Sequence, residues 1–318
     1  MLPRPSLEFA SPRKLPKAKS LRGNVVVLDI AFASEAGGGF EKTTKPLIDG
    51  LGPRLRAWVD HHDHLLHATY RSDPRFVLAT KQEHPACPEM VTPELVEKTG
   101  PIETIVCHSD FDGLCSAAKW IREGIEPYPG ADADARAIDT RIGQPSVVGD
   151  RIDRALRVRS RDMGFFGLVV SHLASGLADA SLSRLIEEAA REFDVVEKAT
   201  RTFAKEFRSF SLSLATSKAI AKTGVIMDAT AHRGKYDKWL LLLLGQEKAD
   251  VALLIDTDTL SLAAPFDSGV DFLDLLGLSG GMPTLVSVDR GRLGEALQGM
   301  NVMPNVVADL MSLYAKKI

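Results

Sequence analysis

Short apolar runs that alternate with helix-like segments are the feature that most constrains the fold of this chain. Residues 24–30 are apolar and rich in β-branched side chains, which is typical of a strand buried in a parallel sheet. Comparable runs lie at residues 55–59, 76–79, 104–107 and 135–139, and helix candidates lie at residues 42–51, 88–98, 113–123 and 146–159. Strands that alternate with helices at this spacing predict an α/β domain with a mostly parallel sheet.

The second half of the chain shows a different pattern. Between residues 180 and 207, apolar residues recur at helical spacing with charges between them, which predicts a long amphipathic connecting helix. Strand candidates at residues 224–228, 250–255, 260–264 and 284–288, with helix candidates at 236–244 and 270–276, predict a second, smaller α/β unit. The expected parts are therefore a basic flexible tail (1–22), a first domain (23–178), a helical connector (179–222) and a second domain (223–318).

The composition is that of a soluble globular protein. The 318 residues are 45% hydrophobic and 25% charged, and the longest apolar run, residues 239–244, is too short to cross a membrane. A net charge of -3 and an aromatic content of 6% disfavour a long nucleic acid as the main partner. The cysteines Cys87, Cys107 and Cys115 form no CxxC pair, and the N-terminal segment has no apolar signal-peptide core, so we expect a cytoplasmic protein.

Carboxylates and an imidazole directly follow the run at residues 104–107. If that strand continues, the side chains of His108, Asp110 and Asp112 share one side of it. Carboxylates that point into one space repel each other unless a cation neutralises them. Gly113 then permits a sharp turn into a helix. The alternative is a solvated acidic turn in which Asp112 caps that helix, so this motif indicates either a metal site or a helix cap.

Two other strand ends carry similar groups. Asp60, His61 and His62 follow one apolar run, and Asp29 follows another. Because His61 and His62 face opposite sides of a continuing strand, we predict His61 as the metal ligand and His62 as a phosphate contact. Asp60 then completes the coordination shell or fixes a ring tautomer. In open α/β sheets ligands bind at the carboxyl ends of the strands, where these motifs are expected to meet.

Taken together, these motifs resemble those of the DHH phosphoesterase family, which includes single-strand exonucleases, nanoRNases, cyclic-dinucleotide phosphodiesterases and manganese pyrophosphatases. The family's first motif, a His or Asp followed by D-x-D-G, is similar to residues 108–113, and its name-giving motif is similar to residues 60–62. The resemblance implies that Asp29 bridges two metal ions and that Asp139, which precedes a threonine, is a further ligand. The family usually has the D-x-D motif first, so the resemblance also implies a circularly permuted domain.

The resemblance extends to the second domain, which in the family is associated with substrate binding. Gly280 and Gly281 occupy the place of the family's glycine-rich loop, whereas Met282 stands where the family usually has a histidine. His232 or Arg233 is the predicted replacement donor. The alternative for these two residues is a charged turn that caps a helix, and the alternative for the glycines is an ordinary tight turn.

The activity that this resemblance implies is hydrolysis of a nucleotide phosphodiester bond in a short oligonucleotide or in a linear or cyclic dinucleotide. Carboxylates and imidazoles without a thiolate suit two Mn²⁺ ions, with Mg²⁺ or Fe²⁺ as alternatives, and such ions activate water. His62 and Asp60 are the predicted catalytic residues. The alternatives are inorganic pyrophosphatase on the same site and a catalytically silent nucleotide-binding or scaffold protein. No membrane partner is expected, and a homodimer is an open alternative.

Overall fold

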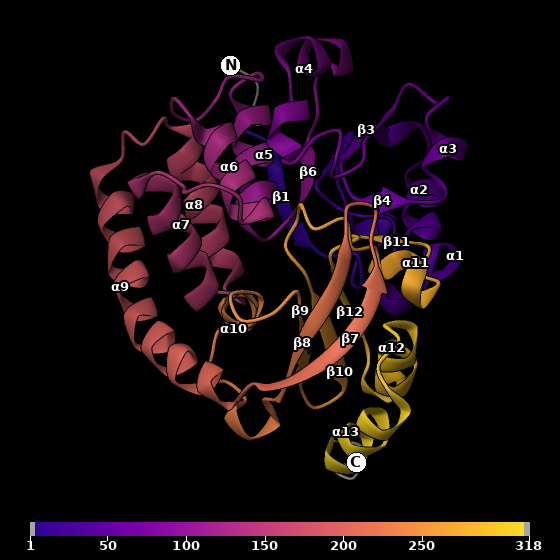
Figure 1. Cartoon of the computed structure of the whole chain (residues 1–318). Helices are drawn as coiled ribbons and strands as arrows, with labels where there is room; N and C mark the ends of the chain where they lie inside the picture. The colour runs from indigo at the N-terminus through magenta and orange to yellow at the C-terminus, as the bar shows by residue number, and fades with distance from the viewer. Residues whose placement is uncertain (1–3, 315–318) are drawn as a thin grey trace. The chain divides into compact units, whose positions relative to one another are not determined.

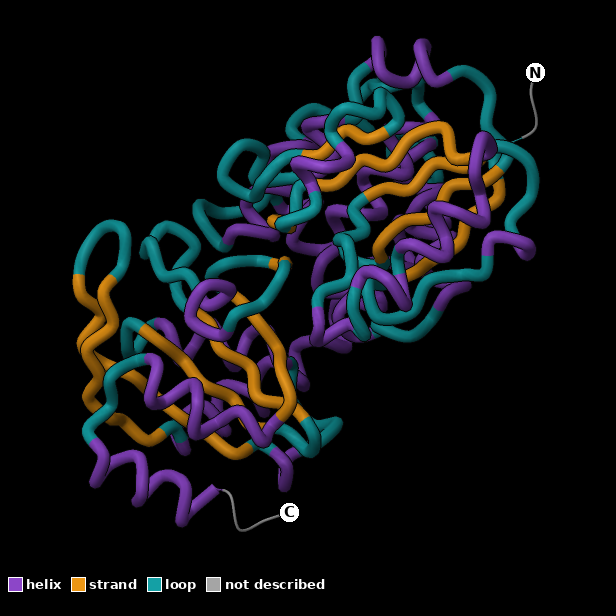
Figure 2. Tube along the Cα trace, turned by 90° about the vertical axis from the view of Figure 1, so that its right-hand side faces the viewer, coloured by secondary structure: helices purple, strands orange, loops and turns teal. Residues whose placement is uncertain are grey.

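The computed structural model describes residues 4–314 and divides the chain into two compact units, the first ending at Phe193 and the second beginning at Asp194. Each unit is an α/β fold built around its own five-stranded sheet. Figure 1 labels most of the helices and strands of both units, and Figure 2 shows by colour which segments are helices, strands and loops. The predicted α/β class with two domains is confirmed.

All five strands of the first sheet run parallel. In chain order they are β1 (Ser6–Ala10), β2 (Val25–Leu28), β3 (Leu55–Asp60), β5 (Phe76–Leu78) and β6 (Thr104–His108). Their order in the sheet is β1-β6-β2-β3-β5, and every neighbouring pair is parallel. The strands β6, β2 and β3 therefore occupy the centre, and their carboxyl ends lie at one edge of the sheet.

Helices cover both faces of this sheet. Val25 and Val27 belong to an apolar cluster with α1 (Phe40–Thr43) and α2 (Lys45–Leu51). Val26 and Leu28 belong to the opposite cluster, to which these helices contribute: α5 (Phe111–Ile121), α6 (Ala131–Thr140), α7 (Val147–Val158) and α8 (Met163–Ala174). A strand buried on both faces needs apolar residues at every position, which is why β2 is a continuous apolar run.

Two of the elements predicted for the first unit differ from those in the structure. The strand predicted at residues 135–139 is part of α6, because Ala131, Ala135 and Ile138 recur at helical spacing and are buried in one cluster. The flexible tail predicted for residues 1–22 contains β1, which pairs with β6. Residues 6–10 alternate between more exposed and more buried positions, as an edge strand does. Residues 1–3 of the predicted tail lie outside the described part of the chain.

The second unit contains a mixed sheet. Its strands, in the order β12-β10-β9-β8-β7, are β7 (Arg208–Ala215), β8 (Ile220–Asp228), β9 (Val251–Ile255), β10 (Thr259–Ala263) and β12 (Leu285–Asp289). Only the β8–β9 pair of this sheet is parallel. Its helices are α10 (Lys238–Gln246), α11 (Phe272–Leu276), α12 (Leu293–Gly299) and α13 (Pro304–Tyr314). Strand β7 lies inside the predicted connector at 179–222, which is therefore helical only in its first part.

The remaining elements are few. Helix α9 (Ala180–Phe203) begins in the first unit and ends in the second, as the predicted connecting helix does. The short elements are β4 (Asp63–His64), α3 (His67–Tyr70), α4 (Pro93–Thr99) and β11 (Gly280–Gly281). Among the helices of the described residues, none has both the length and the apolar character needed to cross a membrane.

Candidate metal centre

The ends of three adjacent strands carry the predicted ligands. Asp29 follows β2, His61 and His62 follow β3, and His108 is the last residue of β6. Because these strands are neighbours in a parallel sheet, their carboxyl ends bring residues that are far apart in the sequence to one place. The order of the motifs along the chain is thus no obstacle to their meeting in space.

Asp29 has a strained backbone that sets the direction of its side chain. Its φ angle is 57°, in the left-handed region, and its N–H donates a 2.9 Å hydrogen bond to the carbonyl of Val59. Aspartate tolerates this region better than most residues, but the conformation still costs free energy. Strain of this kind is found mainly where function requires a particular geometry, and here it lies at the centre of the cluster.

The motif that contains His108 is arranged around the start of α5. The Asp110 side chain caps this helix through the N–H of Gly113 (3.0 Å), and its other oxygen lies 2.7 Å from His108 Nδ1. A Cβ atom on Gly113 would lie 2.5 Å from the His108 carbonyl oxygen, so only glycine fits. The expected extended strand is wrong because the helix begins at Phe111, and the cap is Asp110 rather than Asp112.

Three overlapping groups of side chains have the spacing of metal ligands. Within each group the ligand atoms lie within 4.8 Å of one another. The groups are Asp29 with His61 and His62, Asp29 with His108 and Asp110, and His61 with Asp112 and Asp139. These seven residues form the candidate metal centre, which we call the metal centre below. Asp29 and His61 each belong to two groups, so the three groups form one continuous set of oxygen and nitrogen donors.

His61 is held so that one ring nitrogen faces the carboxylates. Its Nδ1 lies 2.7 Å from the carbonyl oxygen of His84, which can only accept, so Nδ1 carries a proton. Nε2 lies 3.2 Å from Asp29 Oδ1 and 3.1 Å from Asp112 Oδ2. With its ring proton on Nδ1, His61 offers a lone pair at Nε2, which can accept from Lys81 Nζ at 2.7 Å or bind a metal ion.

Asp60 orients His62 and lies outside the three ligand groups. Its Oδ1 is 2.8 Å from His62 Nδ1, and its side chain is fully buried. His62 offsets the burial of this carboxylate and lowers the pKa of Asp60, whereas burial and the charge of Lys81 lower the pKa of His62 to about 4. The expectation that His61 and His62 face opposite sides is wrong, because β3 ends at Asp60 and both rings come near Asp29.

Sequence reasoning missed Lys81, which lies within the metal centre. Its side chain is 3% exposed, its Nζ contacts the carboxylate of Asp139, and Nζ lies 2.7 Å from His61 Nε2. Burial lowers the pKa of Lys81, but Asp139 and the other carboxylates outweigh it, so the pKa lies above its usual value and the side chain is an ammonium ion. The feature that could have pointed to Lys81 is its position just after β5, a strand that lies next to β3 in the sheet.

The segment that follows β5 contributes backbone groups as well. The His84 carbonyl fixes the ring of His61, and the Cys87 N–H lies 3.1 Å from each carboxylate oxygen of Asp112. These backbone groups fix the orientation of the buried side chains of His61 and Asp112, as hydrogen-bond partners of metal-binding side chains do in other proteins. One segment thus supplies Lys81 and two of the backbone groups that position the ligands.

The metal centre has a buried side and an open side. The side chains of Asp29 and His61 are almost fully buried, whereas those of His108 and Asp110 are 29% and 48% exposed. Burial and the neighbouring carboxylates raise the pKa of Asp29 well above its usual value, and Asp110 raises the pKa of His108 to about 9 against the effect of burial. Asp29 Oδ1 accepts no hydrogen bond of good geometry. A buried, unsatisfied carboxylate oxygen among histidine nitrogens fits a divalent cation.

Comparison with the models of known protein families gives no match, and comparison with curated proteins gives none. The resemblance to the DHH family therefore rests on the residues of the motifs and stays a prediction. What the fold adds is independent of that resemblance: the motifs converge on one set of groups that could hold a metal ion.

The residues predicted to bind substrate belong to the second unit. The ring of His232 stacks on Phe203 at a centroid distance of 3.9 Å, and its Nε2 lies 3.0 Å from a Glu206 oxygen. Arg233 is exposed in the following turn. Gly280–Gly281 forms β11, and Gly281 has a φ of +136°, which L-residues with a side chain rarely adopt. Substrate contact by these four residues stays a prediction.

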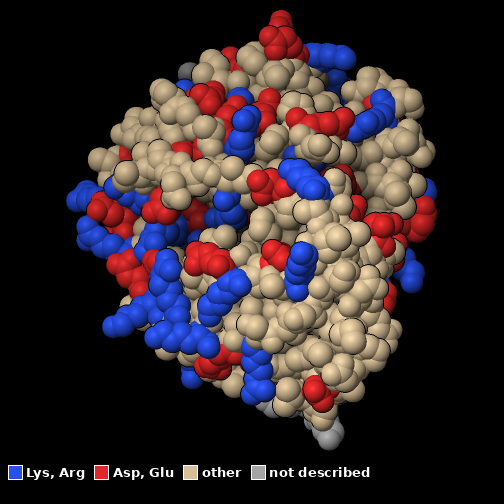
Figure 3. Space-filling model, viewed as in Figure 1, with Lys and Arg blue, Asp and Glu red and all other residues tan. Residues whose placement is uncertain are grey.

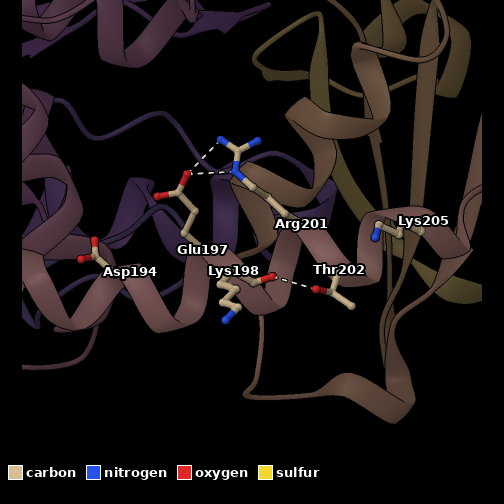
Figure 4. A pocket seen from close by; sticks show the side chains of 6 residues that line it. All are labelled: Asp194, Glu197, Lys198, Arg201, Thr202 and Lys205. Carbon is tan, nitrogen blue, oxygen red and sulfur yellow. Dashed lines mark hydrogen bonds and ion pairs between the residues drawn. The ribbon is translucent and has the colours of Figure 1, made fainter.

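A surface depression of about 390 Å³ lies along the end of α9 and contains no metal-ligand group of the described residues. Figure 3 shows lysine and arginine side chains gathered over this part of the helix. Figure 4 shows its lining residues, where Arg201 pairs with Glu197 at 2.9 Å and Thr202 bonds to the Lys198 carbonyl. Pairs between successive helical turns are usual on a solvated helix face.

Proposed function

We propose that this protein is a metal-dependent phosphoesterase that hydrolyses a nucleotide phosphodiester in a short oligonucleotide or a dinucleotide. The observation that carries the proposal is the gathering of imidazoles and carboxylates at the carboxyl ends of β6, β2 and β3. These donors favour Mn²⁺, with Mg²⁺ or Fe²⁺ as alternatives. When bound, such an ion polarises a phosphoryl oxygen and lowers the pKa of a coordinated water.

In this proposal His62, whose side chain is 21% exposed, is the residue that contacts the substrate. His62 donates from Nδ1 to Asp60, which leaves Nε2 to face a bound group when the ring is neutral. An anionic phosphoryl group beside this ring would raise the pKa of His62 from about 4, and the Asp60 carboxylate would stabilise the resulting imidazolium. We therefore assign His62 to contact with the phosphoryl group and to proton transfer, and Asp60 to positioning His62.

The size of the substrate follows from composition. Low aromatic content and a net charge of -3 disfavour a long polymer, which needs stacking platforms and an extended basic surface. The substrate-binding residues that the resemblance implies belong to the second unit. Its candidate groups are His232 or Arg233 together with the Gly280–Gly281 strand.

The test is hydrolysis by metal-loaded protein of a generic phosphodiester, a linear dinucleotide, a cyclic dinucleotide and pyrophosphate. Asp110→Ala and His61→Ala should abolish Mn²⁺-dependent turnover, whereas Asp49→Ala, an exposed carboxylate paired with Lys45, should not change it. Turnover that is unchanged in both centre variants would refute the site. Turnover of pyrophosphate alone would favour pyrophosphatase over the phosphodiesterase.

A nucleotide-binding protein without turnover is the second candidate, because Lys81 contacts two residues of the ligand set. An ammonium ion in this place could bind phosphate oxygens without activating water. Metal analysis decides between the two candidates when it is combined with the hydrolysis assay. Protein that binds nucleotide but neither retains Mn²⁺ nor hydrolyses any of the four substrates would favour the silent protein.

A further inference from the structure

Lys81 is a buried charge that the proposed reaction does not require. Its ammonium is enclosed by ligand residues: it contacts Asp139 and His61 directly and lies within the field of Asp112 and Asp29. Burying an ammonium is costly unless carboxylates compensate it. Here the compensating carboxylates are the same groups that would coordinate an ion.

The ammonium of Lys81 contacts two of the three residues in one of the ligand groups. His61, Asp112 and Asp139 offer atoms within 4.8 Å of one another, and Nζ contacts two of these residues. An ion bound by the same three residues would lie beside Nζ, and two cations at that separation repel each other strongly in a buried site. The ammonium and the ion are therefore alternatives at this place.

One of the two remaining ligand groups has no direct contact with Lys81 at its exposed residues, although the charge of Lys81 still acts on both of them at longer range. Asp29, His108 and Asp110 form their own ligand group, and no contact between Lys81 and either His108 or Asp110 is found among the described side chains. The His108 and Asp110 side chains are also the more exposed ones, so an ion can reach them from solvent.

We propose that Lys81 is a built-in cation that replaces one of the two metal ions expected from the motifs. One divalent ion then binds at Asp29, His108 and Asp110. The ammonium of Lys81 keeps the group of His61, Asp112 and Asp139 neutral enough to remain buried. This inference concerns the same metal centre as the proposed function and changes the number of ions in it from two to one.

The experiment counts Mn²⁺ bound to full-length protein by equilibrium dialysis and metal analysis. Wild-type protein should hold one ion per chain, and Lys81→Met, which keeps the length of the side chain but removes its charge, should hold two. Lys119→Met is the matched control, because Lys119 is also buried and bonds to a carboxylate, Asp132, outside the centre. This control should hold one ion.

A spectroscopic measurement on wild-type protein keeps the test independent of the folding of the variant. One Mn²⁺ ion gives the hyperfine-split EPR signal of an isolated ion, whereas two ions that share Asp29 couple magnetically. An isolated signal at saturation supports the proposal. Two coupled ions in wild-type protein, or only one ion in folded Lys81→Met, would overturn it and leave the proposed function standing. No bound Mn²⁺ in wild-type protein would overturn both.

Discussion

Replacing Asp29 by asparagine should stabilise the metal-free protein while it weakens metal binding. Asparagine has nearly the same shape and also tolerates the left-handed backbone of this residue, where φ is 57°. The change therefore removes a buried negative charge without altering the packing. What remains is the loss of two unfavourable effects, the burial of a charge and its repulsion by the other carboxylates of the metal centre.

The magnitude follows from the geometry. The ligand atoms of Asp29 and Asp110 lie within 4.8 Å of each other, where two like charges repel by roughly 3.5 kcal/mol at an effective dielectric constant of 20. His108 and Lys81 offset part of this repulsion, so we expect a net gain of about 1–2 kcal/mol in the free energy of unfolding. For a unit of this size that gain raises Tm by about 2–8 °C.

The pH dependence of this gain has a definite sign. The pKa of Asp29 is raised in the folded protein, so between about pH 4 and that raised pKa the folded state holds a proton that the unfolded state has released. The stability of wild-type protein therefore falls as the pH rises through this window, and that of Asp29→Asn does not fall for this reason. The difference in Tm should grow with pH from about 4 upward.

The assay is thermal unfolding at several pH values, with EDTA and with excess Mn²⁺. Mn²⁺ should raise the Tm of wild-type protein and have little effect on Asp29→Asn, whose affinity for the ion should fall at least about 100-fold, above the range typical of outer-shell changes. Asp49→Asn, at an exposed pair, should leave both values unchanged. A lower Tm for metal-free Asp29→Asn at pH 8, or an undiminished effect of Mn²⁺, would refute the reasoning.

Three further predictions concern the same centre. Gly113→Ala should destabilise the protein by about 1–3 kcal/mol, because the new Cβ would lie 2.5 Å from the His108 carbonyl oxygen; an unchanged denaturant midpoint would contradict the clash. Mn²⁺ binding should release protons, because His108, with a pKa of about 9, must be neutral to coordinate the ion. The affinity for Mn²⁺ should therefore rise with pH up to about 9. Calorimetry in two buffers with different ionisation enthalpies counts the protons released. Asp60→Asn should lower kcat by on the order of 10²–10⁴-fold through His62 with unchanged metal content, and a change in KM alone would exclude the positioning role.

The central part of the fold could be predicted because its strands are buried on both faces. Continuous apolar runs such as that of β2 leave few alternatives to a parallel sheet, and such a sheet brings its strand ends together. The same logic located Asp29, His61 and His108. The segment at residues 135–139 was predicted wrongly because a short apolar run has no decisive period, yet Asp139 still reaches the centre from the last turn of α6.

Lys81 could not be predicted because its role depends on surroundings rather than on a motif. A lysine after a short strand is usually solvated, and the sequence does not reveal that the carboxylates of Asp139, Asp112 and Asp29 lie around it. Asp60 illustrates the same limit: the sequence left open whether it binds metal or fixes a ring, and its contact with His62 Nδ1 favours the second role. The spacing of residues in the sequence identifies side chains that can form one site. It does not show which of them bind metal and which hold another side chain in position.

The segment from Lys81 to Cys87 has a consequence for how such a centre can change. It supplies one ammonium, the His84 carbonyl and the Cys87 N–H, while the ligands themselves come from the ends of other elements. The residue that determines how many metal ions the centre binds therefore lies outside the motifs that supply the ligands. A substitution in this one segment could convert the centre between one and two ions while every ligand stays in place, so proteins with identical motifs could differ in metal requirement.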